Sequence, residues 1–416
     1  MHSSLSTGKI IILSTFFFCL LIAIISCVSV STANKDRVIM GVQSMGTSLS
    51  GMKKEDAKRF FEKTAENRIS QMAILLQYGE KTWTINPEEI QLHGNVDSAV
   101  ESAYGIGREG TALENLISQL KYAITGRSVE FTADYDRQLL ANKLQEIANT
   151  VNTSPVNASI DFQPDGSLKH IPCVIGKTLD TKPIVDALEP QLLSFQHPKI
   201  VVLEPADQPP AIVDADLAPI DSVLASYTTG FYYGDRGDNI VIAASRLDNI
   251  LVRSNTVFSF NNTVGQRTAS AGYKDAPVII DGKMEQDVGG GVCQVSSTLY
   301  NAVLLAGLTP TLRTPHFYPS AYCPPGRDAT VADGLLDFQF MNQLPHNVYL
   351  LSRTYGDCLT IYILGAKSDL QGNTISLESE GSRMHPTIYR IYTRDGEVID
   401  REYMHTDSYD TPKTLD

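Results

Sequence analysis

The feature that most limits how this chain can fold is an uncharged apolar run near its N-terminus, from Ile10 to Val30. Its 21 residues would form a helix roughly 30 Å long at about 1.5 Å of rise per residue, which matches the hydrocarbon thickness of a bilayer. We therefore expect residues 1–34 to form a short cytoplasmic tail and a transmembrane anchor, with the rest of the chain outside the cell membrane. A cleaved signal peptide is the alternative, because Ser31-Thr32-Ala33 offers small residues for cleavage.

The composition of the chain is that of a globular protein. Of its 416 residues, 43% are hydrophobic and 19% are charged, which is enough for several domains with cores of their own. The net charge of -13 and the lack of a basic stripe argue against a nucleic-acid partner. Alternating helical and strand-like segments predict an α+β fold.

Cysteine is scarce outside the apolar run. A disulfide-stabilised scaffold would hold far more cysteines. The sequence contains no Cys-x-x-Cys pair, which a structural zinc site would normally use. We therefore predict no metal and no cofactor. Each of the remaining cysteines is then buried, paired or reactive, and these are Cys173, Cys293, Cys323 and Cys358.

The pattern after the anchor predicts four parts. Residues 37–127 and 128–216 each read as strand, helix, hairpin and helix, so we expect two small α+β domains related as a diverged repeat. Residues 224–365 form a third α+β domain, and residues 366–416 form a strand-rich tail. In the tail, a β-hairpin is expected at Arg394-Asp395-Gly396, and its alternation indicates structure rather than chemistry.

The stretch D-V-G-G-G-V-C-Q-V-S-S-T-L-Y places Cys293 directly after three glycines, Gly289, Gly290 and Gly291, and at the start of a predicted helix. Apolar residues recur at helical spacing along that helix, and the cysteine lies off their stripe. The N–H groups and partial positive charge of a helix N-terminus stabilise a thiolate and could hold an acyl oxyanion. The glycines would let a substrate approach the backbone. The other interpretation is a tight turn beside a small buried cysteine.

A nucleophilic cysteine needs a base, and the third domain contains two histidines. His316 stands between two prolines in T-P-H-F-Y-P, and we expect it to be the base, whereas His346 looks like a turn residue. An orienting carboxylate could come from Asp328 or Asp333, and we expect Asp328. Three arginines could meet a substrate carboxylate or could simply be solvated, and these are Arg267, Arg313 and Arg327.

The same residues carry a resemblance to a known family. The runs F-S-F-N-N-T-V-G-Q-R-T-A-S-A-G-Y, G-G-G-V-C-Q-V-S-S-T-L-Y-N-A, R-T-P-H and P-G-R-D-A-T-V resemble the VanW family, in the family's order and across essentially the whole third domain. The two upstream parts resemble domains described as peptidoglycan-binding that accompany VanW domains in bacterial envelope proteins. Their best motif is G-V-Q-S-M-G-T-S-L-S-G-M.

The resemblance implies that the protein acts on the peptidoglycan of the cell wall. Some members are described as L,D-transpeptidases that form 3-3 cross-links between peptidoglycan stem peptides through the cysteine of the G-G-G-V-C-Q motif. That cysteine corresponds to Cys293, and the glycines and Gln294 are then expected at the substrate. A non-catalytic wall-binding protein, or an accessory factor of glycopeptide resistance, is the alternative. Cys323 departs from the family pattern, and a disulfide with Cys358 or Cys293 is a further possibility.

Overall fold

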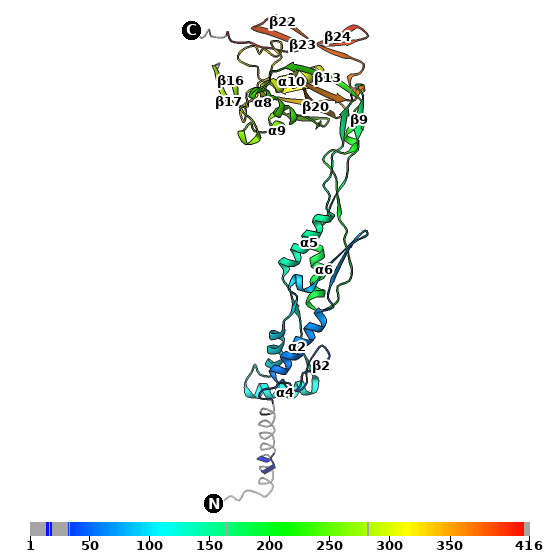
Figure 1. The fold of residues 1–416 in the computed structure, drawn as a ribbon, viewed down its shortest axis with the longest axis vertical. Helices are drawn as coiled ribbons and strands as arrows, with labels where there is room; N and C mark the ends of the chain where they lie inside the picture. The colour runs from blue at the N-terminus through cyan, green and yellow to red at the C-terminus, as the bar shows by residue number, and fades with distance from the viewer. Residues whose placement is uncertain are drawn as a thin grey trace, which may run out of the picture. The chain divides into compact units, whose positions relative to one another are not determined.

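The computed structural model describes residues 14–15, 17–18, 32, 34–163, 165–280 and 283–411. The expected anchor at residues 10–30 lies almost entirely outside these residues. In the described part of the chain, no helix combines the length and the apolarity that crossing a bilayer requires. The chain divides into two compact units, Met1–Ser154 with Gly176–Gln208, and Pro155–Ile175 with Pro209–Asp416 (Figure 1).

The first unit combines helices with short sheets of two or three strands. Its helices are α2 (Lys54–Ile69), α3 (Val96–Gly105), α4 (Ala112–Thr125), α5 (Arg137–Val151) and α6 (Lys182–Leu193). Its three-stranded sheets are β2-β1-β6 (Thr47–Ser48, Val42–Ser44 and Arg127–Ser128) and β11-β3-β4 (Val201–Val202, Ile74–Tyr78 and Lys81–Ile85). Two further strand pairs are β5 (His93–Gly94) with β7 (Ala133–Asp134) and β10 (Gly176–Thr178) with β12 (Ala206–Gln208).

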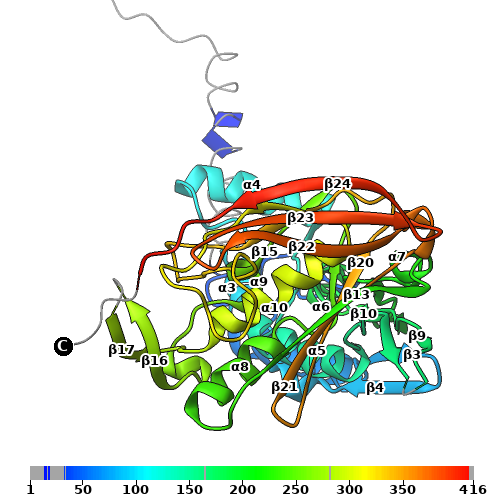
Figure 2. The same ribbon diagram turned by 90° about the horizontal axis from the view of Figure 1, so that it is seen from above.

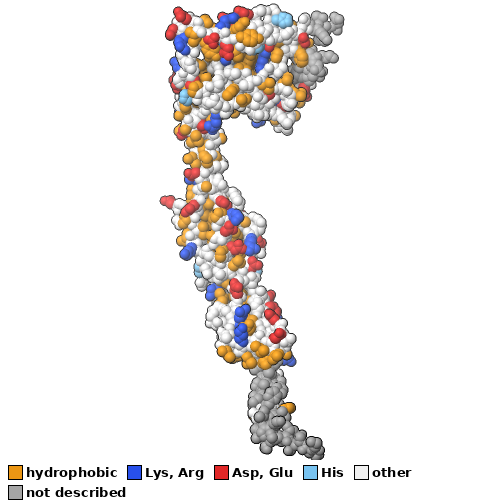
Figure 3. Space-filling model, turned by 180° about the vertical axis from the view of Figure 1, so that it is seen from behind, with side chains coloured by type: hydrophobic (Ala, Val, Ile, Leu, Met, Phe, Trp, Pro, Cys, Tyr) orange, Lys and Arg blue, Asp and Glu red, His pale blue; other side chains and the backbone are white. Residues whose placement is uncertain are grey.

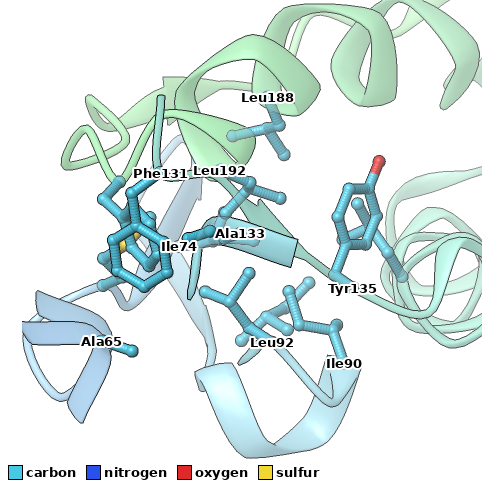
Figure 4. Close-up of a cluster of buried hydrophobic side chains, with 14 of the residues drawn as sticks. Ala65, Ile74, Ile90, Leu92, Phe131, Ala133, Tyr135, Leu188 and Leu192 are labelled. Atoms are coloured by element: carbon cyan, nitrogen blue, oxygen red, sulfur yellow. The ribbon is translucent and has the colours of Figure 1, made fainter. Parts of the chain in front are cut away.

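One hydrophobic core joins buried residues from Val38 to Leu203 of the first unit, and Figure 4 shows part of it. The ring of Phe131 lies 4.8 Å from that of Phe61 and 5.0 Å from that of Phe195, measured between centroids. Strand β11, near the end of the unit's sequence, also pairs in parallel with β3, which lies more than 100 residues earlier in the chain. The expected division into domains 37–127 and 128–216 is therefore not seen, because the two segments bury their apolar faces against each other.

The second unit is built on a four-stranded antiparallel sheet, β13-β21-β20-β14 (Ser222–Gly230, Cys358–Gly365, Val348–Tyr355 and Ile250–Val252). Residues Val348 to Leu351 of β20 are all fully buried, which requires cover on both faces of the sheet. Val348 and Leu350 join the core that contains helices α8 (Asp235–Ser245) and α10 (Val292–Leu305). Tyr349 and Leu351 join a second cluster on the other face.

That second cluster is covered by the hairpin β8–β9 (Ser159–Phe162 and Leu168–Ile171). The sequence predicts this hairpin but assigns it to residues 128–216. In the structure it belongs to the second unit instead, because Ile160 packs beside Tyr349 and Leu364. Residues 155–175 therefore contribute to a different core from the residues that flank them.

The tail forms a three-stranded antiparallel sheet of β22 (Thr374–Ser382), β23 (His385–Arg394) and β24 (Glu397–Thr406). The predicted hairpin at residues 394–396 is confirmed. The sheet lies against α10 (Figures 1 and 2), where the buried Arg390 donates to the Leu308 carbonyl at 2.8 Å. The remaining elements of the unit are β15-β19-β18 (Thr256–Ser259, Gln339–Asn342 and Thr309–Leu312), the hairpin β16–β17 (Asp275–Ile280 and Lys283–Val288), and the short helices α7 (Asp214–Leu217) and α9 (Phe260–Val264). The chain is thus α+β, as predicted.

Candidate active site

The three glycines form a tight, packed turn into α10. Gly289 and Gly291 have φ of 89° and 109°, the left-handed region that favours glycine. A Cβ atom on Gly290 would lie 2.7 Å from the backbone of Ala276 in β16. The glycines are therefore required by the turn and by close packing against β16. They place Cys293 in the first turn of α10, where N–H groups have no intrahelical acceptor.

Helix α10 is buried on its polar side as well as on its apolar side. The hydroxyl of Ser297 accepts from the N–H of Ala329 at 2.9 Å, and the amide of Asn301 donates to the carbonyl of Arg327 at 2.7 Å. These bonds fix the loop that carries Asp328 against the helix that carries the cysteine. The polar residues of the motif thus position a second part of the site.

The structure brings Cys293, His316 and Asp328 together. The Oδ2 atom of Asp328 accepts from Nδ1 of His316 at 2.6 Å and from the backbone N–H of His316 at 2.7 Å. The imidazole in turn lies near the thiol of Cys293, which donates to the carbonyl of Val331 at 3.4 Å and accepts from the N–H of Val331 at 3.5 Å. A carboxylate at Nδ1 leaves Nε2 as the nitrogen that can exchange a proton with sulfur.

The charges of these groups favour a thiolate–imidazolium pair. Burial raises the pKa of the Cys293 thiol, but the nearby imidazole of His316 and the backbone N–H of Val331 outweigh it, and the pKa falls below its ordinary value. Burial lowers the pKa of His316, but Asp328 and Cys293 raise it to about 9. The pKa of Asp328 is lowered to about 2, because its bonds to His316 and the charge of Arg313 outweigh burial.

The tail of the chain braces the carboxylate, which sequence reasoning did not foresee. The guanidinium of Arg313 bonds to Asp328 Oδ1 at 3.2 Å and to Asp407 Oδ1 at 2.6 Å. The hydroxyl of Tyr409 donates to Asp328 Oδ1 and accepts from the N–H of Gly326 at 2.7 Å. Asp407 and Tyr409 follow the last strand in an ordinary polar stretch, so no local pattern marks them.

The other residues expected at the substrate have partners of their own. Arg267 pairs with Asp333 and donates to Asn261 at 2.7 Å, so Asp333 is not the carboxylate beside His316. The amide of Gln294 is buried and donates to the carbonyl of Gly230 at 2.6 Å. The expectation that these side chains meet a substrate stays a prediction, and in this structure their polar groups are bonded inside the unit.

The side chain of Arg313 is 8% exposed, and its guanidinium is held by the carboxylates of Asp328 and Asp407. Arg327 is half-buried, and one of its guanidinium nitrogens donates to the carbonyl of Leu377 at 2.9 Å. Tyr322, a residue that the sequence did not single out, lies beside the triad. Its ring centroid is 6.4 Å from that of His316 in an edge-on arrangement.

The four cysteines in the described part of the chain are free. The possible disulfide of Cys323 with Cys358 or Cys293 is therefore not formed. Burial raises the pKa of Cys323 to about 12, so this thiol is protonated beside Ser320. His346 bonds to Asp369 at 2.8 Å and takes no part in the triad.

Comparison with known proteins identifies the family of this chain. Residues 235–364 match the family described as "VanW like protein", and residues 83–199 match the family described as "Putative peptidoglycan binding domain". The chain belongs to the VanW-like family and carries a peptidoglycan-binding domain beside its VanW-like domain. The second match crosses the expected boundary at residue 127, as the shared core does.

Two relatives support this membership. The chain is 36% identical to the uncharacterized protein YoaR of Bacillus subtilis over 232 residues, which covers 55% of this chain and 74% of YoaR. It is 31% identical to the vancomycin B-type resistance protein VanW of Enterococcus faecalis over 130 residues, which covers 29% of this chain and 47% of that protein. No solved structure matches the chain.

Proposed function

We propose that this protein is a cysteine acyltransferase of the L,D-transpeptidase type that forms 3-3 cross-links between peptidoglycan stem peptides. The observation that carries the proposal is the chain of contacts from Cys293 through His316 to Asp328. A thiol paired with an imidazole that a buried carboxylate orients is the arrangement of cysteine acyl-transfer enzymes. The peptidoglycan-binding domain supports peptidoglycan as the partner.

The proposed reaction has two half-reactions. The Cys293 thiolate attacks the carbonyl carbon of the L,D bond between residues three and four of a donor stem. The C–N bond breaks, the imidazolium of His316 gives its proton to the leaving D-alanine amine, and a thioester remains on sulfur. The side-chain amine of a second stem then attacks the thioester, His316 takes the proton of that amine, and the thiolate leaves. Water in place of the amine would give a carboxypeptidase.

The backbone at the start of α10 would stabilise the oxyanion of both half-reactions. The N–H of Cys293 lies in the first turn of the helix, and no acceptor pairs with it among the described residues. Such an N–H, together with the positive end of the helix dipole, stabilises a developing negative charge. The bonded side chains of Arg313 and Gln294 would then hold the site in shape rather than bind the substrate.

We also propose that residues 10–30 anchor the protein in the cell membrane by a single span. The support is the length and the lack of charge of that run. The body of the chain would then face the cell wall, where stem peptides are found.

A second candidate is a wall-binding protein without catalysis. It is favoured by the family description of residues 83–199, which names binding, and by the resistance role in the name of one relative. In that case the residues around Cys293 would shape a ligand groove. The two candidates differ in whether the thiol reacts.

The experiment that tests the proposal compares the purified protein with its Cys293→Ala variant on tetrapeptide muropeptides. We expect the wild type to release D-alanine and to form a 3-3 cross-linked product, and the variant to form neither. Binding of the muropeptides by both proteins with no product from either would favour the second candidate. Equal product from both would reject Cys293 as the nucleophile.

A further inference from the structure

Helix α4 of the first unit presents its apolar side to solvent. Its residues Leu113, Ile117, Leu120 and Ile124 are 67%, 57%, 51% and 87% exposed. Their spacing of four, three and four residues puts them in one stripe along the helix. No residue of α4 is fully buried. In Figure 3, hydrophobic side chains gather at the end of this unit at which α4 lies in Figure 1.

The opposite side of α4 faces the protein, where Tyr122 packs against the core and two polar residues lie beside it. Asn115 and Gln119 are half-buried there. The side chain of Asn115 accepts from the N–H of Gly110 at 2.9 Å, and that of Gln119 donates to the carbonyl of Gly107 at 3.0 Å. A helix on the surface of a soluble domain normally has the reverse arrangement, with its apolar stripe toward the core. This helix therefore has an apolar surface that its own domain does not cover.

The N-terminal end of the described body lies on this same helix. Asn34 donates to the side chain of Gln119 at 2.9 Å, and its carbonyl accepts from Arg108 at 2.6 Å. The apolar run ends at Val30. Four residues of extended chain span at most about 14 Å, so α4 lies within that reach of the end of the run.

We propose that α4 lies on the extracytoplasmic surface of the bilayer, with its stripe of four apolar side chains in the boundary between lipid headgroups and acyl chains. Amphipathic helices bind membranes in this orientation, with the helix axis in the plane of the surface. Lys121, exposed beside the stripe, would face the headgroups. The proposal rests on the anchor proposed for residues 10–30 and is independent of catalysis at Cys293.

A lipid surface fits this stripe better than a second copy of the chain. Stable protein interfaces bury roughly 800 Å² on each partner, which needs some 20 residues a side, and one row of four side chains falls well short of that. A bilayer requires no matched partner surface, and the nearby end of the apolar run brings it to the helix. The proposed arrangement would hold the first unit against the membrane.

The first test measures the depth of α4 in lipid. The full chain with Trp83→Phe and Ile117→Trp is reconstituted in vesicles of phosphatidylethanolamine and phosphatidylglycerol that carry brominated acyl chains. We expect quenching of the tryptophan at position 117 by bromine placed near the headgroup end of the chains. The unsubstituted chain serves as the control. Its single tryptophan, Trp83, lies in β4 and should not be quenched. A blue-shifted but unquenched emission at position 117 would mean that protein covers the stripe, and would overturn the proposal.

The second test separates α4 from the anchor. A protease site is placed between Ala33 and Asn34 of the full chain, and the body is released by cleavage on the vesicles. We expect the body to stay bound, and Ile117→Gln and Ile124→Gln each to weaken binding about tenfold. Thr125→Gln, at an exposed polar position of the same helix, should bind like the wild type.

Complete dissociation of the cleaved wild type would overturn the proposal. An uncleaved chain that extracts in salt like a peripheral protein, with a body that still binds through α4, would reject only the anchor. Activity on muropeptides is scored separately, because neither result bears on Cys293.

Discussion

Replacing Asp328 by asparagine should uncouple the cysteine from its base. The pKa of His316 lies at about 9 instead of 6.5, and among the interactions that raise it the hydrogen bond to Asp328 ranks first. The difference of about 2.5 pKa units corresponds to about 3 kcal/mol in favour of the imidazolium. Loss of even half of that difference lowers the equilibrium constant for proton transfer from the thiol to the imidazole at least tenfold, because one pKa unit is a tenfold change.

The assay is the rate of alkylation of Cys293 by iodoacetamide between pH 5 and pH 9, with the labelled cysteine identified by peptide mass spectrometry. We expect the Asp328→Asn variant to react several-fold to about tenfold more slowly than the wild type near pH 7. Circular dichroism and the urea midpoint serve as fold controls, and Arg313 keeps Asp407 as a partner in the variant. An unchanged rate and pH profile in a folded variant would refute the coupling.

Three further predictions concern stability. The carboxylate of Asp328, with its pKa at about 2 instead of 3.8, stabilises the folded chain by about 2 kcal/mol above pH 3.8, and this is lost as the pH falls through about 2. The difference in unfolding free energy between wild type and Asp328→Asn should therefore narrow between pH 4 and pH 2, and a constant difference would contradict the assigned pKa. Tyr409→Phe removes the hydrogen bond to Asp328 and leaves the Gly326 N–H without its acceptor. It should therefore lower the unfolding free energy, measured by urea denaturation, by about 1–3 kcal/mol. An unchanged unfolding free energy would contradict the role of the tail in holding Asp328. Gly290→Ala should lower the unfolding free energy by about 1–3 kcal/mol, because the added Cβ would meet the backbone of Ala276. The control Gly105→Ala should be nearly neutral, because its Cβ would meet only the side chain of Glu109 at 3.5 Å. Equal effects of the two substitutions would refute the packing role of Gly290.

The sequence predicted the local elements of the site because local patterns encode them. The glycines and the helical spacing after them predict the turn and α10, and the two prolines around His316 predict a loop. The hairpin expected within residues 37–127 forms as β3–β4, and the hairpin at residues 394–396 forms as expected, since their turn residues lie between strand-like runs. Of the two candidate carboxylates, the expected Asp328 bonds to His316, whereas Asp333 pairs with Arg267.

What the sequence could not predict depends on contacts between distant segments. The core shared by the first unit joins residues such as Phe61 and Phe195, and no periodicity reports that pairing. The same limit applies to Asp407 and Tyr409, which reach Asp328 from the end of the chain. The arginines and Gln294 were expected at the substrate because of their chemistry. Their engagement by buried partners is visible only once the loops are in place.

The central claim is that Cys293 carries an acyl group during the reaction. The most direct test is the intact mass of the purified protein after incubation with tetrapeptide muropeptides, followed by mapping of the modified peptide. The account predicts an adduct on Cys293 with the mass of the donor after loss of D-alanine, which disappears when an amine acceptor is added. An unmodified Cys293 in protein that binds the muropeptides would contradict it.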